Sequence, residues 1–343
     1  MKAAYLTGHG GNEVVAVGHR PEPARRVGDV LVRLRAATVN RVDLYMRDSG
    51  AGITHTLPLI MGLDGAGVIE ELDRDHPSLR VGQRVVLHPG VTCGHCEFCL
   101  RGEDVLCTSM KLLGEHHDGT FAQWVSVPAR NVFALPKGYD DVQAAALGVN
   151  HLTAWRMLFT QARLQAHETV LIFGIGGGVS LAALQLAKAA GARAIVTSRD
   201  ASKLERALQL GADATVHSAT QDIARTVLDL TGGRGVDVVI ENVGAAVWSA
   251  ALKSLVRGGR LVTCGATTGD QPGADLRRMF IRQLKVMGST LGTLGEFREL
   301  LALCERSSMR PVIDSIHALD AVPQALDRLE SGAQFGKVAL SIE

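Results

Sequence analysis

The sequence predicts an α/β protein of two domains, and three observations support this prediction. The chain has 343 residues, more than a single hydrophobic core usually serves. Residues 1–140 contain short strand-like runs between Gly and Pro signals, whereas apolar strands alternate with helices from Asp141 onward. A glycine-rich loop stands between one of those strands and a helix. Apolar strands that alternate with helices indicate a doubly wound parallel sheet covered on both faces.

The β-rich first part is predicted from period-two alternation. Residues 30–36 alternate apolar and polar side chains, as a half-buried strand does. Residues 67–72 and 83–87 have a similar pattern. The hydrophobic pattern then changes, and residues 142–147 and 152–161 are typical of helices.

The second part is predicted as a repeated strand–helix alternation. Its expected elements, in chain order, are strand 169–173, helix 181–190, strand 194–197, helix 202–210 and strands 236–240 and 259–263. Gly211 ends the helix before it, as glycine commonly does. The remaining chain adds helices at 297–306 and 321–331 and a last strand at 338–342.

Composition excludes several classes of function. Lys plus Arg number 36 and Asp plus Glu 35, so the net charge of +1 argues against a surface for nucleic acid or anionic membrane. Aromatic residues make up 4 %, too few for the stacking platforms of single-strand binders. The sequence lacks the run of about 18 apolar residues that a membrane span needs, and its first residues do not resemble a secretory signal. We therefore expect a cytoplasmic protein.

The glycine-rich loop predicts a dinucleotide site. It lies in a strand–loop–helix unit and contains Gly174, Gly176, Gly177, Gly178 and Val179. Glycines let the backbone approach a pyrophosphate, and the helix N-terminus supplies free N–H groups. The spacing departs from G-x-G-x-x-G because Val179 occupies the sixth place. The alternative is a tight turn without a ligand.

The end of the following strand bears on the choice of nucleotide. An NAD site usually places an acidic residue there, to bind the ribose 2′-hydroxyl. Here Ser198 stands in that place, with Arg199 beside it and Lys203 one turn later. A hydroxyl and two cations suit a 2′-phosphate, so we favour NADP(H) over NAD(H). In the alternative, Asp200 reaches the ribose and the two cations are solvated.

Four of the six cysteines predict one structural zinc site. Their spacing is C-x2-C-x2-C-x7-C, formed by Cys93, Cys96, Cys99 and Cys107. Four thiolates make a closed tetrahedral site that leaves no position for a substrate. An iron–sulfur cluster is the alternative. Cys264 and Cys304 lie far away in sequence and are expected to be small buried apolar residues.

Together, the cysteine lobe and the glycine loop resemble the medium-chain dehydrogenase/reductase superfamily over nearly the whole chain. Residues 114–125 and 335–338 carry further likeness. The resemblance implies a Rossmann domain inserted into a β-rich, GroES-like domain, with the active site in the cleft. It divides the chain into a GroES-like catalytic domain (1–148, with the zinc lobe at 93–107), a Rossmann cofactor-binding domain (149–291) and a tail that completes the catalytic domain (292–343).

Zinc-dependent alcohol dehydrogenases of this superfamily hold a second, catalytic zinc, and the sequence departs from that pattern. Asn40 stands in place of the first cysteine ligand, and Leu63 stands in place of the histidine. Asp64 replaces the glutamate that follows, and the third ligand position falls near Val149. Leu and Val offer no ligand atom, so we expect the catalytic zinc to be absent.

The run Val39-Asn40-x-x-Asp43, with residues 152–155, is similar to the quinone oxidoreductase branch, which lacks catalytic zinc. This likeness implies an NADPH-dependent oxidoreductase that transfers hydride to a quinone or an α,β-unsaturated carbonyl without a catalytic metal. Such an acceptor is already electrophilic, so hydrogen-bond donors suffice for the charge that develops on its oxygen.

Three residues are candidates for catalysis: Asn40, Thr153 and His151. We expect Asn40 to donate to the substrate oxygen or the ribose and Thr153 to contact the nicotinamide. His151 or Tyr45 would deliver the proton. The alternatives are a satisfied turn residue at Asn40 and a core or surface histidine at position 151. The cofactor site is expected to include two further residues, Asn242 and Lys337.

Two other functions stay open. One is an alcohol dehydrogenase or aldehyde reductase with different metal ligands, for which the candidates are Asp64, His55, His88, His117 and His151. The other is a protein that binds NADPH in a structural or regulatory role without turnover. The family resemblance also implies a homo-oligomer, a dimer or a tetramer, that pairs through residues 259–291.

Overall fold

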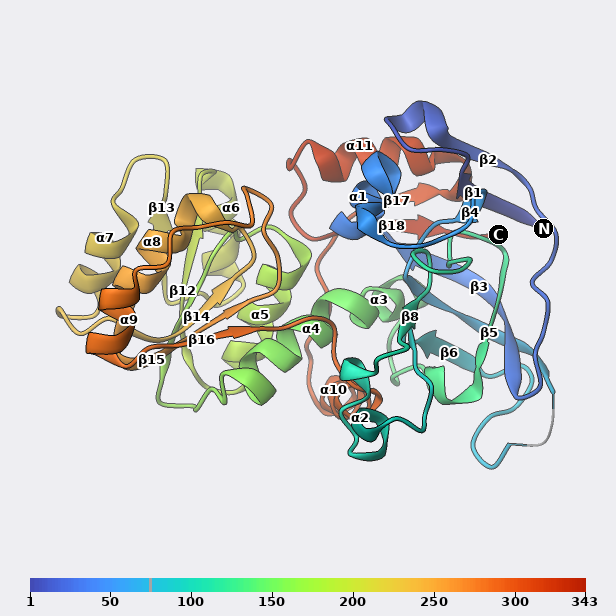
Figure 1. Ribbon diagram of the computed structural model, residues 1–343, viewed down its shortest axis with the longest axis horizontal. Helices are drawn as coiled ribbons and strands as arrows, with labels where there is room; N and C mark the ends of the chain where they lie inside the picture. Colours follow the sequence, from blue (N-terminus) through green and yellow to red (C-terminus); the bar gives the residue numbers. More distant parts are fainter. Residues whose placement is uncertain (74–75) are drawn as a thin grey trace. The chain divides into compact units, whose positions relative to one another are not determined.

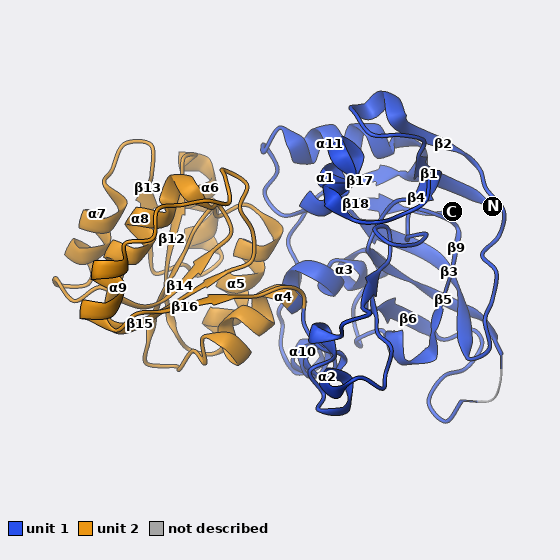
Figure 2. Ribbon diagram, viewed as in Figure 1, with its two compact units in different colours: residues 1–152, 292–343 blue, residues 153–291 orange. Residues whose placement is uncertain are grey.

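The computed structural model describes residues 1–73 and 76–343, which divide into two compact units (Figure 2). Unit 1 contains residues 1–152 and 292–343, and unit 2 contains residues 153–291. Both ends of the chain therefore belong to one unit, and the middle of the chain forms the other. The first division falls at residue 152, where the sequence analysis expected 148.

Unit 2 is built on six strands, all of which pair in parallel. The strands are β11 (Thr169–Ile172), β12 (Arg193–Ser198), β13 (Ala214–His217), β14 (Val236–Glu241), β15 (Leu255–Thr263) and β16 (Lys285–Gly288). Their spatial order is β13-β12-β11-β14-β15-β16. Figure 1 shows this sheet with helices of the same unit beside it. The order reverses between β11 and β14, and ligands of such sheets bind beyond the carboxyl ends of the strands at this point.

Helices connect these strands, and their first residues explain where they begin. They are α5 (Gly178–Ala189), α6 (Ala201–Gln209), α7 (Ile223–Leu230), α8 (Ala245–Ser254) and α9 (Leu276–Arg282). Asp200, Asp222 and Asp275 each accept backbone N–H bonds as the N-caps of α6, α7 and α9. Both faces of β11 are buried, since Val170, Leu171 and Ile172 are 0 % exposed. This confirms the predicted α/β fold with a doubly wound parallel sheet.

Unit 1 is β-rich. Its strands are β1 (Lys2–Leu6), β2 (Val15–His19), β3 (Asp29–Thr38), β4 (Leu59–Ile60), β5 (Asp64–Leu72), β6 (Arg84–Leu87), β7 (Gly90–Val91), β8 (Lys111–Leu112), β9 (Trp124–Pro128), β10 (Val132–Ala134), β17 (Ile313–Ala318) and β18 (Lys337–Ser341). The largest sheet has the order β10-β6-β5-β3-β18-β17, with β9 paired to β3. A smaller sheet has the order β2-β1-β4, and β7 pairs with β8.

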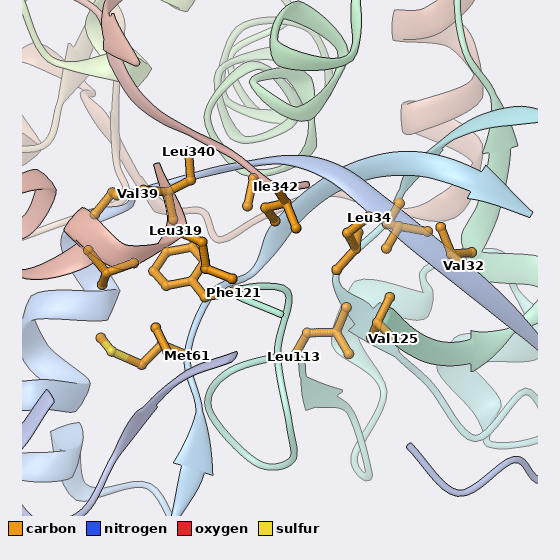
Figure 3. Packing of buried hydrophobic residues seen from close by; sticks show 14 of the residues in the cluster. Val32, Leu34, Val39, Met61, Leu113, Phe121, Val125, Leu319, Leu340 and Ile342 are labelled. Atoms are coloured by element: carbon orange, nitrogen blue, oxygen red, sulfur yellow. The ribbon is translucent and has the colours of Figure 1, made fainter. Parts of the chain in front are cut away.

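The C-terminal segment completes unit 1 by pairing with its first long strand. β18 is antiparallel to β3, with Ala339 opposite Thr38, and β17 lies parallel to β18. Helices α10 (Leu294–Arg306) and α11 (Val322–Glu330) belong to the same segment. Figure 3 shows the packing that results, in which Val39 and Phe121 lie with Leu340 in one buried cluster. This pairing places the start of β18 beside the end of β3.

The remaining helices of unit 1 are short. They are α1 (Arg41–Ser49), α2 (Glu97–Leu100) and α3 (Asp141–Ala145), and α4 (Leu152–Trp155) lies at the division between the units. The predicted helices at 142–147 and 152–161 are partly π-helical, in the turns η5 (Leu147–His151) and η6 (Arg156–Gln161). Within the described residues, no helix is long and apolar enough to cross a membrane.

Candidate active site

The four cysteines converge in unit 1 at one point of the lobe that contains α2. Their sulfurs all lie within 4.8 Å of one another, and the described residues contain no other group of three or more His, Cys, Asp or Glu side chains this close. The Cys96–Cys99, Cys93–Cys107 and Cys93–Cys99 sulfur distances are 3.5, 3.6 and 3.9 Å. A tetrahedron with Zn–S bonds of about 2.3 Å has edges of about 3.8 Å. The sulfur geometry therefore fits one zinc ion.

Backbone N–H groups favour negative charge on Cys93 and Cys96, whereas burial raises the pKa of Cys99 to about 11. The N–H of Cys96 points to Cys93 Sγ and that of Cys93 to Cys107 Sγ, both at 3.3 Å. The backbone N–H of Cys99 does most to lower the pKa of Cys96, to about 6. Thiolates are the form that binds zinc. The lobe is also tied to the C-terminal segment, because Asp104 accepts the backbone N–H of Leu294 at the start of α10.

A second polar cluster of unit 1 lies where β3 and β5 meet the start of β18. Lys337 Nζ donates to Asn40 Oδ1 at 2.6 Å and lies 3.2 Å from Asp64 Oδ2. Asn40 Nδ2 donates to Asp64 Oδ2 at 2.9 Å and to the carbonyl of Thr38 at 3.3 Å. Thr38 Oγ1 donates to the same carboxylate oxygen at 2.6 Å. We call Thr38, Asn40, Asp64 and Lys337 the lysine network.

Within the lysine network, Lys337 and Asp64 form a buried ion pair. Exposure is 3 % for Lys337 and 0 % for Asp64. Burial lowers the pKa of Lys337, and the charge of Asp64 opposes that shift. Close by, burial raises the pKa of Asp43 to about 7. One oxygen of each carboxyl, Asp43 Oδ1 and Asp64 Oδ1, has no hydrogen-bond partner among the described residues.

This geometry changes the role predicted for Asn40. Both hydrogens of its amide nitrogen are already donated, to Asp64 and to Thr38, and the side chain is 3 % exposed. The amide cannot donate to a substrate oxygen without breaking one of these bonds. Its oxygen faces an ammonium group, which repels a metal cation. Leu63, also 3 % exposed, offers no ligand atom.

The positions of two residues in this region, Lys337 and Asn150, were not predicted from the sequence. Lys337 was expected at the cofactor, whereas its ammonium lies within the lysine network. Asn150, on η5, donates from Nδ2 to Asn40 Oδ1 at 3.1 Å. No sequence pattern identifies Asn150, because it is 110 positions from its partner.

The other candidate catalytic side chains differ in exposure. His151 is 2 % exposed and its Nδ1 lies 3.1 Å from the carbonyl of Ala146, while Thr153, in unit 2, is 6 % exposed. Tyr45 is 40 % exposed on α1, and partial burial raises its pKa. His88 Nε2 contacts the carbonyl of Gly292, and burial lowers its pKa. Within residues 1–73 and 76–343, the five alternative metal ligands do not gather into one group.

The glycine loop of unit 2 has the backbone that a phosphate site needs. Gly174 has φ +67° and Gly176 φ +111°, in the region that side chains rarely adopt. A Cβ on Gly176 would lie 2.8 Å from Lys203 Cδ, and one on Gly174 would lie 3.6 Å from Asn242 Oδ1. Helix α5 begins at Gly178 with no side-chain cap on its first N–H groups. The loop therefore fits a dinucleotide pyrophosphate, and Lys203 and Asn242 lie beside it.

The end of β12 carries the residues expected to select the nucleotide. Ser198 is 8 % exposed and its Oγ accepts the backbone N–H of Asp200. Asp200 Oδ1 accepts the hydroxyl of Ser202, which does most to lower its pKa, and the backbone N–H groups of Ser202 and Lys203, which lower it further. Asp200 thus serves as the N-cap of α6, and Arg199 is exposed beside it.

A cavity of about 500 Å³ lies in unit 2 at the carboxyl ends of β14, β15 and β16. Glu241 lines it, and the carboxylate accepts the backbone N–H groups of Val243 and Gly244. Burial raises the pKa of Glu241, and burial raises that of Cys264 to about 12. Trp248 Nε1 and Ser289 Oγ line the cavity as buried donors that lack a partner among the described residues. The cavity lies on the sheet edge where ligands of such folds bind.

A glycine loop on a parallel sheet and a cysteine lobe in a β-rich unit define a two-domain dehydrogenase. Two family models match the chain: an alcohol dehydrogenase GroES-like domain over residues 26–137 and a zinc-binding dehydrogenase over residues 178–306. The chain belongs to the medium-chain dehydrogenase/reductase superfamily, in its zinc-type alcohol dehydrogenase family, and is an oxidoreductase.

Individual relatives match the chain from end to end. An alcohol dehydrogenase of Geobacillus stearothermophilus is 30 % identical, with 100 % of this chain and 99 % of the relative covered. An NAD-dependent alcohol dehydrogenase of Sulfolobus acidocaldarius is 31 % identical, with 100 % of both covered. The crystal structure of an NAD-dependent alcohol dehydrogenase has a TM-score of 0.96 and 37 % identity, again with 100 % of both covered.

These relatives bear on the sequence predictions. They confirm the superfamily and the enzyme class. Their names favour the alcohol dehydrogenase alternative over the quinone or enone reductase, and they do not support the preference for NADP(H).

Proposed function

We propose that the chain transfers hydride between a nicotinamide dinucleotide and a small substrate, interconverting an alcohol and its carbonyl compound. The relatives named alcohol dehydrogenases, which cover the whole chain, support this reaction type. The glycine loop and the open N-terminus of α5 supply the pyrophosphate site. When bound, the nicotinamide supplies or accepts the hydride, and water supplies or accepts the proton that balances the reaction. The chain's own residues bind and orient the substrate.

The lysine network supports a proposal about which groups stabilise the charge on the substrate oxygen. By the family resemblance, positions 40, 63 and 149 would hold a catalytic metal, and here they are Asn, Leu and Val. An ammonium and amide groups occupy that region. We infer that hydrogen bonds, rather than a Lewis acid, stabilise the charge on the substrate oxygen in both directions of the reaction.

The same substitutions favour a second candidate, hydride transfer to a quinone or an α,β-unsaturated carbonyl. In these acceptors the charge that arrives with the hydride is delocalised to an oxygen, so that weak hydrogen bonds are enough. The two candidates share the cofactor and the zinc lobe, and they differ in the bond that is reduced.

The cofactor is a further part of the proposal. Ser198, Arg199 and Lys203 favour NADP(H), whereas relatives named NAD-dependent favour NAD(H). Asp200 is engaged as a helix cap, which supports NADP(H) because the acidic side chain is already used. We expect Arg199→Asp to weaken NADPH binding about tenfold and NADH binding less than twofold, since only NADPH carries the 2′-phosphate. Equal losses in a fluorescence titration would contradict this preference.

One assay panel tests the function. The purified chain is given NADH or NADPH with a small aldehyde, a ketone, an enone or a quinone, and NAD⁺ or NADP⁺ with a small alcohol. We expect carbonyl reduction to be faster than alcohol oxidation at neutral pH. Turnover only with the enone or quinone would favour the second candidate. Tight cofactor binding without turnover of any compound would show a binding protein and refute both.

Assembly into a homo-oligomer is also proposed. Strand β16 is an edge of its sheet, and the neighbouring helix α9 leaves Leu276 and Phe280 66 % and 69 % exposed. An exposed edge strand beside apolar side chains is a liability for a monomer. Light scattering at micromolar concentration should give twice the chain mass or more, and the mass of one chain would refute the proposal.

A further inference from the structure

The hydrogen bonds around Asn40 have a fixed direction that ends at Asn150. Lys337 Nζ only donates, so the Asn40 atom that it contacts at 2.6 Å is the amide oxygen. The Asn40 atom that faces Asp64 Oδ2 at 2.9 Å is then the amide nitrogen. Since Asn40 Oδ1 is an acceptor, the Asn150 atom 3.1 Å from it is a donor, Nδ2. The buried ion pair therefore determines that the amide nitrogen of Asn150, and not its oxygen, faces Asn40.

Asn150 is the member of this chain of bonds that reaches the surface of unit 1. Asn40, Asp64 and Lys337 are at most 3 % exposed, whereas Asn150 is partly exposed. One N–H of Asn150 is used in the bond to Asn40. Its second N–H and its oxygen have no hydrogen bond to any described residue. A buried charged pair thus orients a polar group whose remaining donor is left for a ligand.

The backbone under Asn150 supports a role in binding. Asn150 lies on the π-helical turn η5, and such turns are rare and are often found at functional sites. The turn passes directly against the ion pair, since a Cβ on Gly148 would lie 2.5 Å from Asp64 Oδ1. The conformation of η5 therefore brings Asn150 within reach of Asn40.

From this geometry we propose that Asn150 binds the substrate oxygen, donating its second N–H to the oxygen on which negative charge develops during carbonyl reduction. The inference rests on the proposed function and names the group that contacts the substrate. Asn150 contributes only a hydrogen bond, and its covalent bonds do not change. A donor that is oriented before the substrate arrives stabilises developing charge without reorganisation.

The test compares two substitutions at this position with a matched asparagine. Asn150→Ala and Asn150→Leu both remove the donor, and the second keeps the number and branching of the side-chain heavy atoms. Asn12→Ala is the control, because Asn12 Nδ2 also donates within unit 1, to Pro323 and Asp327, without a bond to the lysine network. The readouts are kcat and KM with the best carbonyl substrate of the panel, the Kd of the reduced cofactor, and the melting temperature.

We expect both Asn150 variants to lose about 100-fold in kcat, the usual effect of removing one donor to a developing oxyanion. The Kd of the cofactor should change less than twofold, and Asn12→Ala should keep the unaltered kcat. An unchanged kcat in both Asn150 variants, or a loss confined to cofactor binding, would overturn the inference while the proposed function stands. Absence of turnover by the unaltered protein across the panel would overturn both.

Discussion

Unit 1 contains two clusters of ligand-type residues that differ in their charge. The cysteine cluster gathers four sulfurs within 4.8 Å, and none of its four members is a cationic side chain. The lysine network gathers a carboxylate and an amide oxygen around the ammonium of Lys337. The first cluster needs an external cation to balance its thiolates, whereas the second contains its cation. The comparison teaches that the residues facing a cluster, as well as its potential ligands, decide whether a metal fits.

The largest expected effect concerns the cysteine lobe. Of residues 93–107, the buried side chains are Val105 and Cys107, so the lobe has almost no core of its own. Zinc supplies about 10–16 kcal/mol of apparent binding free energy in small zinc-finger peptides. We expect Cys99→Ser to lose its zinc, to melt earlier and to be cleaved by protease within the lobe. Cys304→Ser is the control and should keep its zinc. Zinc retained by Cys99→Ser would contradict the assignment.

A smaller effect is expected from the lysine network. Lys337→Met should cost about 3–5 kcal/mol of unfolding free energy, because it leaves the charge of Asp64 buried without its partner. The matched control is Lys2→Met, which breaks the exposed pair between Lys2 and Asp320 and should cost less than about 1 kcal/mol. Urea unfolding measures both. Equal costs would show that the buried pair is no more important than the surface pair.

The smallest effect concerns pH. The pKa of Asp43 is raised by burial to about 7, above its usual 3.8, so between these values the folded chain holds a proton that the unfolded chain releases. Stability from this group is therefore present below about pH 4 and is lost as pH rises through 7. Asp43→Asn cannot ionise, so its melting temperature should fall less between pH 5 and 8. The exposed N-cap variant Asp222→Asn should follow the unaltered protein, and parallel curves for all three would refute this effect.

Much of the fold follows from the sequence, because local patterns determine it. The apolar runs that became β11, β12 and β14 are too short for helices and lie between turn signals. Strands β13 and β16 were not predicted, since each has only four residues with mixed polarity. The helix predicted at 152–161 is divided into α4 and the π-helical η6, which periodicity does not distinguish from a continuous helix.

The candidate site was predictable only where its residues are close in sequence. The four cysteines and the glycine loop each lie within fifteen residues or fewer, and their spacing identified them. Lys337 is 273 positions from Asp64, and only the pairing of β18 with β3 brings them together. The same is true of Asn150 and Asn40. Long-range pairings of this kind leave no pattern in a single sequence.

The zinc content of the purified, active protein tests the contrast between the two clusters most directly. We predict one zinc per chain, lost in Cys99→Ser and unchanged in Lys337→Met. Two zinc ions per chain in the unaltered protein, with activity that depends on the second, would contradict the conclusion that the internal ammonium of Lys337 stands in a region without a catalytic metal.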